Sequence, residues 1–358
     1  MAGAAVRYHT VDGKDAESAF LGFIADHRQA IQKRVFDFLP SKPRRGSILH
    51  EHYAMVRDYP ERGGKYVRPG LLLLSCAASG REVSRAMTTA AAMEISEDWI
   101  LIHDDFQDRS LERRGQPALP VIYGPELSVN AGNHLHVIMW NALLANTEAL
   151  GAEHAVEISR EMSQILQRTC EGQYLDLCWT LRGGFITERQ YYEMVDRKTG
   201  WYTIIGPLRL GALVARHSKA LSPLINFGIP LGRAFQIHDD WLNVFSRRTG
   251  KKLGDDILEG KRTLLLIHLL ECLEKGGRAK KAGEVRSLFS KRREERTWSD
   301  VQDIIHLYEA HGCREWVRAR ALRCAEQAKR ALNQVPYRDK RCKAILSDAV
   351  DFLVNREL

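Results

Sequence analysis

An apolar run is followed by three aspartates in the stretch Ile100-Leu101-Ile102-His103-Asp104-Asp105-Phe106-Gln107-Asp108. On a helix, Asp104 and Asp108 share one face, because positions i and i+4 are neighbours there. Two carboxylates about 4 Å apart repel by roughly 4 kcal/mol at an effective dielectric near 20, so a role in stability alone is a poor explanation. Mg²⁺ binds carboxylate oxygens and shares its other positions with water and phosphate. The stretch therefore predicts a helix that ends in a cation site at the rim of an apolar core.

A second copy of this pattern lies further along the chain, in Phe235-Gln236-Ile237-His238-Asp239-Asp240-Trp241-Leu242-Asn243. One Asp-Asp-x-x-Asp segment is a weak signal, because exposed helix ends are often acidic. The repetition, with apolar residues before each copy, favours a metal-dependent function over a chance acidic surface. The histidines that precede the aspartate pairs, His103 and His238, are expected to pack behind the carboxylates, since Mg²⁺ prefers oxygen ligands.

Most of the chain has the composition and periodicity of α-helix. Helix formers dominate, apolar residues recur at three- and four-residue spacing, and β-branched runs with period two are scarce. The length of 358 residues and the hydrophobic content of 44% allow a large core, and no Pro/Ser-rich linker divides the chain. We expect an all-α, single-domain bundle of long helices over residues 21–358, preceded by an undefined segment, residues 1–20. The clearest helical stretches are 85–102, 130–150, 155–177, 301–308 and 315–332.

Basic residues accompany both aspartate motifs and contribute to the net charge of +8. Arg113-Arg114-Gly115 follows the first motif, whereas Lys252 and the segment Gly254–Thr263 follow the second. The cluster Gly63–Pro69 combines lysine and arginine with paired glycines, which free backbone N–H groups for an anion. Lys198-Thr199-Gly200 is a fourth, weaker element. Carboxylates, a dication and Lys/Arg side chains together form a cradle for a polyanion, and a diphosphate fits it best.

The basic stretch 275–296 is expected to be a solvated, mobile loop. It contains Lys280-Lys281 and Lys291-Arg292-Arg293, but it lacks the interleaved aromatic residues on which single-stranded nucleic acid would stack. No recognition module for nucleic acid is visible elsewhere, so a nucleic-acid binder is the weakest of the alternatives.

The seven cysteines are an odd number without Cys-x-x-Cys spacing, which predicts reduced thiols and no structural zinc site. The N-terminus lacks the pattern of a signal peptide, and the apolar runs are too short to span a bilayer. We therefore expect a cytoplasmic protein without a transmembrane segment.

In their order along the chain, these motifs resemble those of the trans (head-to-tail) isoprenyl diphosphate synthases, in particular archaeal-type short-chain geranylgeranyl and farnesyl diphosphate synthases. The resemblance implies a helical bundle around a central cavity, with the two aspartate motifs facing each other across its mouth. It also implies several Mg²⁺ ions per site and a homodimer, for which the helix over 130–150 is a candidate interface. The matching segments are Gly63-Gly64-Lys65-x-x-Arg68-Pro69, Asp104-Asp105-x-x-Asp108 with Arg113-Arg114-Gly115, Lys198-Thr199, Phe235-Gln236-x-x-Asp239-Asp240, and Gly254-Asp255-Asp256 with Gly260-Lys261-Arg262-Thr263.

The resemblance also implies roles for individual residues. An enzyme of this kind joins isopentenyl diphosphate to an allylic diphosphate, which ionises as cations neutralise the departing diphosphate. No side-chain nucleophile is required, and an apolar wall shields the allylic cation from water. Mg²⁺ would be held by Asp104, Asp105, Asp108, Asp239 and Asp240. The allylic diphosphate would be held by Arg113, Lys198, Thr199, Gln236, Lys252 and Lys261. Isopentenyl diphosphate would be held by Lys65, Arg68 and Arg114.

Two residues depart from the family's pattern. Glu97 lies seven residues before the first aspartate, where the family usually has His or Gln that helps to bind isopentenyl diphosphate. A carboxylate at this position would repel the diphosphate, which predicts a weak affinity for isopentenyl diphosphate. Asn243 replaces the third aspartate of the second motif and can still accept a hydrogen bond.

The residues just before the first motif are expected to limit the length of the product. By resemblance, bulk at Trp99 forms the floor of a tunnel, with Ile100 beside it and Ser96 one turn deeper. An indole would stop growth early and give a product of about fifteen to twenty carbons. The alternative is an ordinary core tryptophan.

Two other functions stay open. A class I terpene cyclase has the same fold and metal chemistry, but it needs no isopentenyl cradle such as Gly63–Pro69 with Arg113-Arg114. A catalytically silent partner subunit of a prenyl synthase is compatible with the carboxylate of Glu97.

If Trp99 is the floor, Trp99→Ala lengthens the product by at least one five-carbon unit, because the tunnel gains the volume of the indole. Chromatography of the dephosphorylated products measures this. An unchanged product distribution would assign the tryptophan to the core instead.

Overall fold

The computed structural model describes residues 4–246 and 253–357, and this part of the chain is almost entirely helical, as predicted. Two short hairpins interrupt the helices: β1 (Val6–His9) pairs with β2 (Asp15–Ser18), and β3 (Glu112–Arg113) pairs with β4 (Gln116–Pro117). The helices are α1 (Ala19–Phe38), α2 (His50–Arg62), α3 (Val67–Ala78), α4 (Met87–Asp108), α5 (Leu119–Tyr123), α6 (Pro125–Leu144), α7 (Asn146–Leu150), α8 (Ala152–Leu181), α9 (Glu188–Val195), α10 (Gly206–Val214), α11 (Ser218–Phe245), α12 (Asp255–Glu259), α13 (Leu264–Lys275), α14 (Ala279–Ser290), α15 (Trp298–Ala310), α16 (Cys313–Asn333) and α17 (Lys340–Asn355). A π-helical segment, Asp196–Ile205, joins α9 to α10, and 3-10 turns occupy Val83–Ala86 and Arg293–Glu295.

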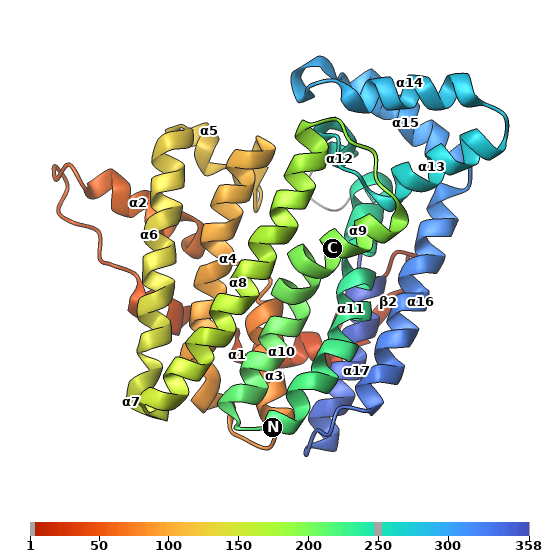
Figure 1. The fold of residues 1–358 in the computed structure, drawn as a ribbon. Helices are drawn as coiled ribbons and strands as arrows, with labels where there is room; N and C mark the ends of the chain where they lie inside the picture. Colours follow the sequence, from red (N-terminus) through yellow and green to blue (C-terminus); the bar gives the residue numbers. More distant parts are fainter. Residues whose placement is uncertain (1–3, 247–252, 358) are drawn as a thin grey trace.

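The long helices form a bundle around one continuous apolar core. Helix α4 packs against α6 on one side, α11 packs against α16 on the other, and α8 lies between these pairs (Figure 1). The helices α12, α14 and α15 lie at the same end of the bundle as α5 (Figure 1). The five predicted helical stretches are confirmed, except that a break at Ala145 separates α6 from α7.

The N-terminal segment is a hairpin that packs against α17. Tyr8 of β1 contacts the ring of Phe352 edge-on, with ring centroids 5.1 Å apart. The hydroxyl of Ser18 accepts a hydrogen bond from the N–H of Leu21 and so caps α1, and it donates to Asp348 at 2.7 Å. These contacts give residues 4–18 a defined structure that their composition does not indicate.

The prediction of a solvated, mobile loop over 275–296 is wrong. The stretch contains α14, where Ala282, Val285 and Phe289 are spaced three and four residues apart and are buried. This apolar stripe fixes one face of α14 to the protein, while the basic residues occupy its other faces.

In the part of the chain that the structure describes, no helix combines the length and apolarity needed to cross a bilayer.

Two glycines let the π-helical segment lie unusually close to its neighbours. A Cβ on Gly172 of α8 would lie 2.2 Å from the backbone nitrogen of Lys198, and one on Gly232 of α11 would lie 2.5 Å from the Cα of Gly200. The segment therefore packs directly between two helix backbones, which fixes the direction of the side chains at 198 and 199.

Gly172→Ala should destabilise the fold by about 2 kcal/mol, because the added methyl group must push the backbone at Lys198 aside. The matched control is Gly283→Ala in α14, where an added Cβ meets nothing within 4 Å. That exchange should be neutral or stabilising by up to about 1 kcal/mol, since alanine is the better helix former. Thermal unfolding followed by circular dichroism compares the two, and equal melting temperatures would contradict the close packing.

Candidate active site between the two aspartate motifs

The first aspartate motif occupies the last turn of α4, which ends where Arg109 adopts a left-handed backbone conformation. Asp105 is fully buried and its carboxylate accepts hydrogen bonds from the hydroxyl of Tyr59 at 2.6 Å and from the Nε of Arg113 at 3.0 Å. Asp104 and Asp108 lie one turn apart with more exposed side chains, at 25% and 12%. The two carboxylates that can reach a ligand are therefore Asp104 and Asp108, whereas Asp105 anchors the surrounding structure.

A tight hairpin places two arginines beside this helix end. Strands β3 and β4 pair Arg113 with Gln116, so the loop consists of Arg114 and Gly115, and both have positive φ, as a type I′ turn requires. The turn sends Arg113 to Asp105 and sends Arg114 to Asp98, where the Nη1–Oδ1 distance is 2.9 Å.

Two lysines from distant segments meet at the first motif. The Nζ of Lys261 lies 2.7 Å from Asp108 and 3.2 Å from Asp176, and the Nζ of Lys198 lies 2.7 Å from Asp176 and 3.9 Å from Asp104. Burial alone would raise the pKa of Asp176, but the two ammonium groups outweigh it and hold that pKa far below the ordinary value. Asp176 is thus a permanent carboxylate that fixes both lysines beside the first motif.

The second motif lies in the last third of α11 and is fixed by neighbouring polar side chains. Asp240 is buried and accepts hydrogen bonds from Tyr191 at 2.7 Å and from Gln236 at 2.8 Å. Gln236 in turn accepts one from Thr199 at 2.5 Å. Burial raises the pKa of Asp240 to about 6, although both donors oppose the shift. Asp239 is 38% exposed and pairs with Arg356 at 2.5 Å.

A small cavity at the second motif is connected to the first motif by ion pairs. A chain of ion pairs runs from Asp108 through Lys261 and Asp176 to Lys198 and Asp104. The same lysines help to line a cavity of about 70 Å³ that reaches the second motif. Its lining residues are Asp176, Tyr191, Met194, Lys198, Gln236, Asp240, Asp256, Lys261, Arg262 and Thr263. Carboxylates and ammonium groups converge there from α8, α11, α12, the π-helical segment and the segment after α12.

Comparison with known proteins identifies this arrangement. Residues 50–306 match the model of the polyprenyl synthetase family. The chain belongs to the polyprenyl synthetase family. It is 32% identical to the short chain isoprenyl diphosphate synthase of Methanothermobacter thermautotrophicus over 93% of this chain and 96% of the relative. It is 30% identical to the geranylgeranyl pyrophosphate synthase of Geoglobus acetivorans, over 93% and 98% of the two chains.

Solved structures agree with this assignment. The geranylgeranyl pyrophosphate synthase of Corynebacterium glutamicum, crystallised with isoprenyl diphosphate and magnesium, superposes with a TM-score of 0.82 at 26% identity. The superposition covers 91% of this chain and 97% of that one. The Geoglobus acetivorans enzyme superposes with a TM-score of 0.75 at 27% identity, over 95% and 99% of the two chains.

Other residues predicted from the family resemblance are only partly gathered at the cavity. Lys65 lies within electrostatic reach of Asp239 and Glu97. Arg68 forms an ion pair with Glu97 at 2.7 Å. Lys252 lies outside the described residues. Asn243 does not face the charged side chains of the cavity. Its side-chain oxygen instead accepts a hydrogen bond from the backbone N–H of Asp256 at 3.1 Å.

The three predicted floor residues point in different directions. Trp99 packs on the rings of His136 and His103, at centroid distances of 4.7 and 5.4 Å, and so faces α6. Ser96 is buried and shares a hydrogen bond of 2.9 Å with the hydroxyl of Tyr202 in the π-helical segment. Ile100 is half-buried against the core.

Both motif histidines bond to backbone carbonyls. His103 lies 3.3 Å from the carbonyl oxygen of Val129, and the buried His238 lies 2.7 Å from that of Arg356. Burial lowers the pKa of both rings, so they pack as neutral groups behind the carboxylates.

Several functional side chains were missed by sequence reasoning. Asp176 and Gln173 project from α8 toward the first motif, and Gln173 donates to Asp104 at 3.2 Å. Their spacing of three residues, which puts both on one face of a helix, was a usable signal. Arg293, in the 3-10 turn after α14, donates to the carbonyl oxygen of Asp108 at 3.0 Å and pairs with Glu259 at 3.2 Å. Only the fold could bring that arginine to the cavity.

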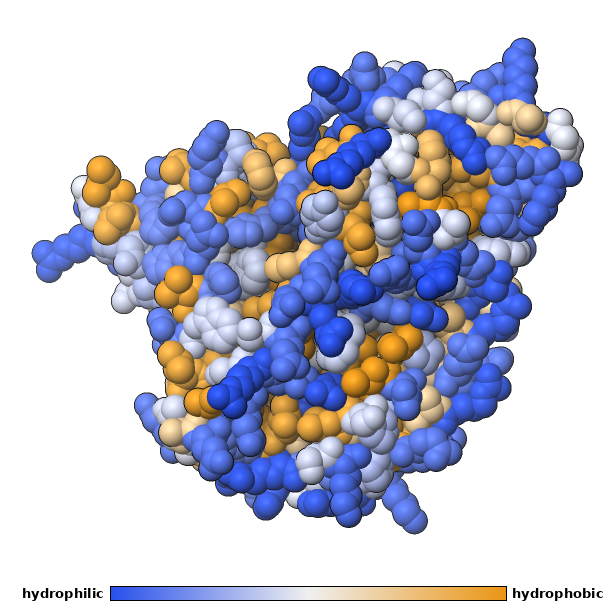
Figure 2. Space-filling view, viewed as in Figure 1, coloured by the Kyte–Doolittle hydropathy of each residue, from blue (hydrophilic) through white to orange (hydrophobic). Residues whose placement is uncertain are grey.

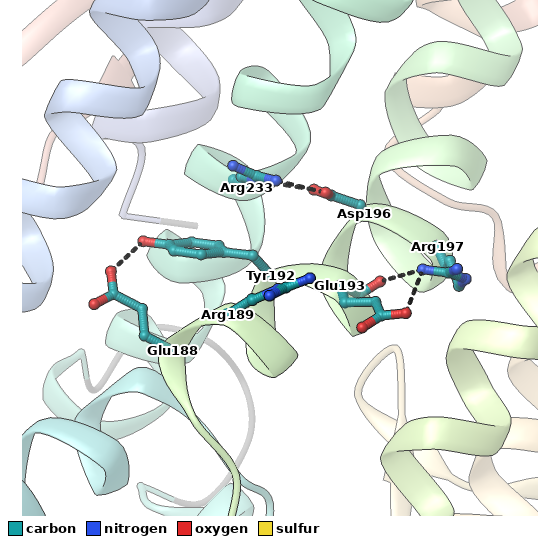
Figure 3. Close-up of a pocket in the computed structure, with 7 residues that line it drawn as sticks. All are labelled: Glu188, Arg189, Tyr192, Glu193, Asp196, Arg197 and Arg233. Carbon is teal, nitrogen blue, oxygen red and sulfur yellow. Dashed lines mark hydrogen bonds and ion pairs between the residues drawn. The ribbon is translucent and has the colours of Figure 1, made fainter.

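A larger hollow of about 630 Å³ lies on the outer face of α9 and the π-helical segment, and it is not the active site. Figure 3 shows Arg233 directed at Asp196, Arg197 at Glu193, and Tyr192 at Glu188. Because the carboxylates of the hollow pair with its own arginines and tyrosine, it offers no concentrated charge to a diphosphate. Its lining residues are Glu188, Arg189, Tyr192, Glu193, Asp196, Arg197 and Arg233.

Asp176→Asn should raise the KM for the allylic diphosphate about tenfold, because Lys198 and Lys261 lose the carboxylate that holds them both. This loss corresponds to roughly one charge-assisted hydrogen bond. Steady-state kinetics with the allylic substrate varied measures the effect. The matched control is Asp196→Asn, which breaks the ion pair to Arg233 on the outer face of the same segment. Equal KM values for the two variants would show that Asp176 does not position the lysines.

Proposed function

We propose that this protein condenses isopentenyl diphosphate head-to-tail with an allylic diphosphate to give a short-chain prenyl diphosphate. The observation that carries the proposal is that Lys198 and Lys261 pair with Asp104 and Asp108 of the first motif and also line a cavity with Asp240 of the second. Family membership and the short-chain relatives support it.

The carboxylates fit magnesium that is shared with a substrate. Asp104, Asp108 and Asp239 offer hard oxygen donors on partly exposed side chains. No group of three potential ligands is close enough to hold a metal among residues 4–246 and 253–357. In proteins, Mg²⁺ is usually bound by one or two carboxylates together with substrate phosphates. When bound, Mg²⁺ would supply positive charge to the departing diphosphate, and Asp105 and Asp240 would act through their hydrogen-bonded partners.

The chain's own residues bind and orient the allylic substrate. Lys198 and Lys261 give up part of their ion pairing with Asp104 and Asp108 and bind the diphosphate oxygens instead. Thr199 and Gln236 orient the same group by hydrogen bonds, and the predicted role of Lys252 extends this set. The ammonium groups stabilise the negative charge that grows on the diphosphate as the allylic C–O bond breaks. Apolar side chains deeper in the bundle keep water from the resulting cation.

The isopentenyl double bond then attacks the cation, and a proton leaves the new chain for the departed diphosphate. Lys65, Arg68 and Arg114 hold the isopentenyl diphosphate during this step. The product is expected to have about fifteen to twenty carbons if Trp99, on the side of α6, blocks the tunnel, with Ile100 beside it and Ser96 one turn deeper.

The protein is also proposed to act as a cytoplasmic homodimer through α5 and α6. Apolar atoms gather in the left part of Figure 2, where Figure 1 places these helices. The exposed apolar residues there are Val121, Ile122, Leu127, Val137 and Leu144. Burying these apolar side chains against a second copy would remove them from water.

One incubation tests the proposed reaction: purified protein, Mg²⁺, isopentenyl diphosphate and dimethylallyl, geranyl or farnesyl diphosphate. The expected product is an elongated prenyl diphosphate that is lost on chelation of the metal. A hydrocarbon would identify a terpene cyclase, and no turnover in any combination would identify a silent partner subunit.

Asp104→Ala and Asp239→Ala should each lower kcat by about 10²-fold or more, because each removes a carboxylate from the diphosphate cradle. Asp303→Ala, at an exposed position of α15, is the control and should leave kcat unchanged. Wild-type turnover in either cradle variant would contradict the proposed site.

A further inference from the structure

Both arginines assigned to the isopentenyl diphosphate already pair with carboxylates of α4. Arg68 lies 2.7 Å from Glu97, and Arg114 lies 2.9 Å from Asp98. These pairs are mostly buried, with side-chain exposures of 20% and 17% for the first and 15% and 1% for the second. Sequence comparison with the family singled out Glu97, whereas Asp98 emerges only from the structure.

A third carboxylate closes this cluster. Glu94, one turn before Asp98, is buried, and one of its carboxylate oxygens has no hydrogen-bond partner. The turn before α3 lies against it, because a Cβ on Gly64 would come 2.8 Å from Glu94 and 3.1 Å from Arg114. The acceptor subsite is therefore a buried cluster of two guanidinium groups and three carboxyl groups.

The subsite still keeps donors for a ligand. The Nε of Arg68 and the Nη2 of Arg114 are buried and have no partner. Arg68 also lies over the ring of Tyr202, 4.7 Å from its centroid, and donates to Thr203 at 3.0 Å, so its position is fixed from a second side. Because these N–H groups are buried, a diphosphate can reach them only when the ion pairs open, and it then competes with the carboxylates of Glu97 and Asp98 for the same arginines.

We propose that Glu97 and Asp98 are specificity-determining residues of the acceptor subsite, where they compete with the diphosphate of the acceptor for Arg68 and Arg114. Acceptor binding then requires both ion pairs to open or the carboxylates to be neutralised. The affinity for isopentenyl diphosphate is correspondingly low, while the allylic subsite, built on Lys198 and Lys261, keeps its full charge. This inference rests on the proposed function, because it assumes that the acceptor carries a diphosphate.

A dependence on pH follows from the surroundings of Asp98. Burial, helped by Glu97, raises the pKa of Asp98 to about 7, although Arg114 opposes the shift. Below pH 7 the group is protonated and no longer repels a diphosphate, and above pH 7 it is an anion that does. The ionisable groups around it are Arg114 of the β3–β4 turn, Glu94 and Glu97 of α4, Arg68 of α3 and Tyr66 just before α3.

The direct test is isothermal titration of isopentenyl diphosphate alone into the protein, which measures binding without turnover. The double variant Glu97→Gln/Asp98→Asn keeps side-chain volume and frees both arginines. Its Kd should be at least tenfold lower than that of the wild type at pH 8, and the single variant Glu97→Gln should lie between them. The KM for the allylic diphosphate should change less than threefold.

The matched control is Glu161→Gln, which removes the carboxylate from the buried pair with Arg209 (2.5 Å) between α8 and α10. It should leave the Kd unchanged. Circular dichroism establishes that each variant is folded, and Glu97→Gln alone still tests the proposal if the double variant is not.

Repeating the titration from pH 6 to pH 8 separates repulsion from other effects. The wild-type Kd should rise with pH as Asp98 loses its proton, whereas the double variant should show a flat or falling Kd, because the ligand itself gains negative charge. At pH 8, titrations in buffers with different ionisation enthalpies should reveal proton uptake by the wild type only.

A Kd in the double variant that equals or exceeds the wild-type value would overturn the inference. Failure of the proposed function looks different: condensation would be absent from every variant at saturating isopentenyl diphosphate, even where binding is tight. The inference concerns only the Kd and its pH dependence, so the two outcomes are read from separate measurements.

Discussion

The structure depends on counter-charge for carboxylates that face one another in a partly buried space. Asp104 and Asp108 lie beside Asp176, and Lys198 and Lys261 lie between them. Without those ammonium groups the carboxylates would take up protons or force the helices apart. The lysines therefore allow the helix ends to approach, and they are the same cations that the proposed mechanism uses to bind a diphosphate.

Local backbone features make this arrangement possible. The end of α4 at Arg109, the two-residue turn at Arg114-Gly115, and the π-helical segment each set the direction of one charged side chain. Each feature is short and lies beside a long helix whose packing holds it in place. The bundle thus acts as a rigid frame, and the chemistry is carried by brief departures from regular helix at one end of it.

Much of this could be predicted from the sequence, and the limits have physical causes. Helix formers and apolar spacing predict the bundle, and the like-charged spacing of Asp104 and Asp108 predicts a cation site. Which carboxylate faces the cavity could not be predicted, because the burial of Asp105 depends on Tyr59 and the β3–β4 hairpin. The role of Asp98 could not be predicted either. A single aspartate in a helix does not indicate that the turn between β3 and β4 will place Arg114 beside it.

The turn that carries Arg114 has a consequence for engineering. Its φ of 54° is a backbone conformation that glycine and asparagine adopt readily and that costs an arginine on the order of 1 kcal/mol. A screen for thermostability alone would therefore favour Asn-Gly at this turn and discard the guanidinium. Heat tolerance and the proposed recognition of the acceptor make opposite demands on this position.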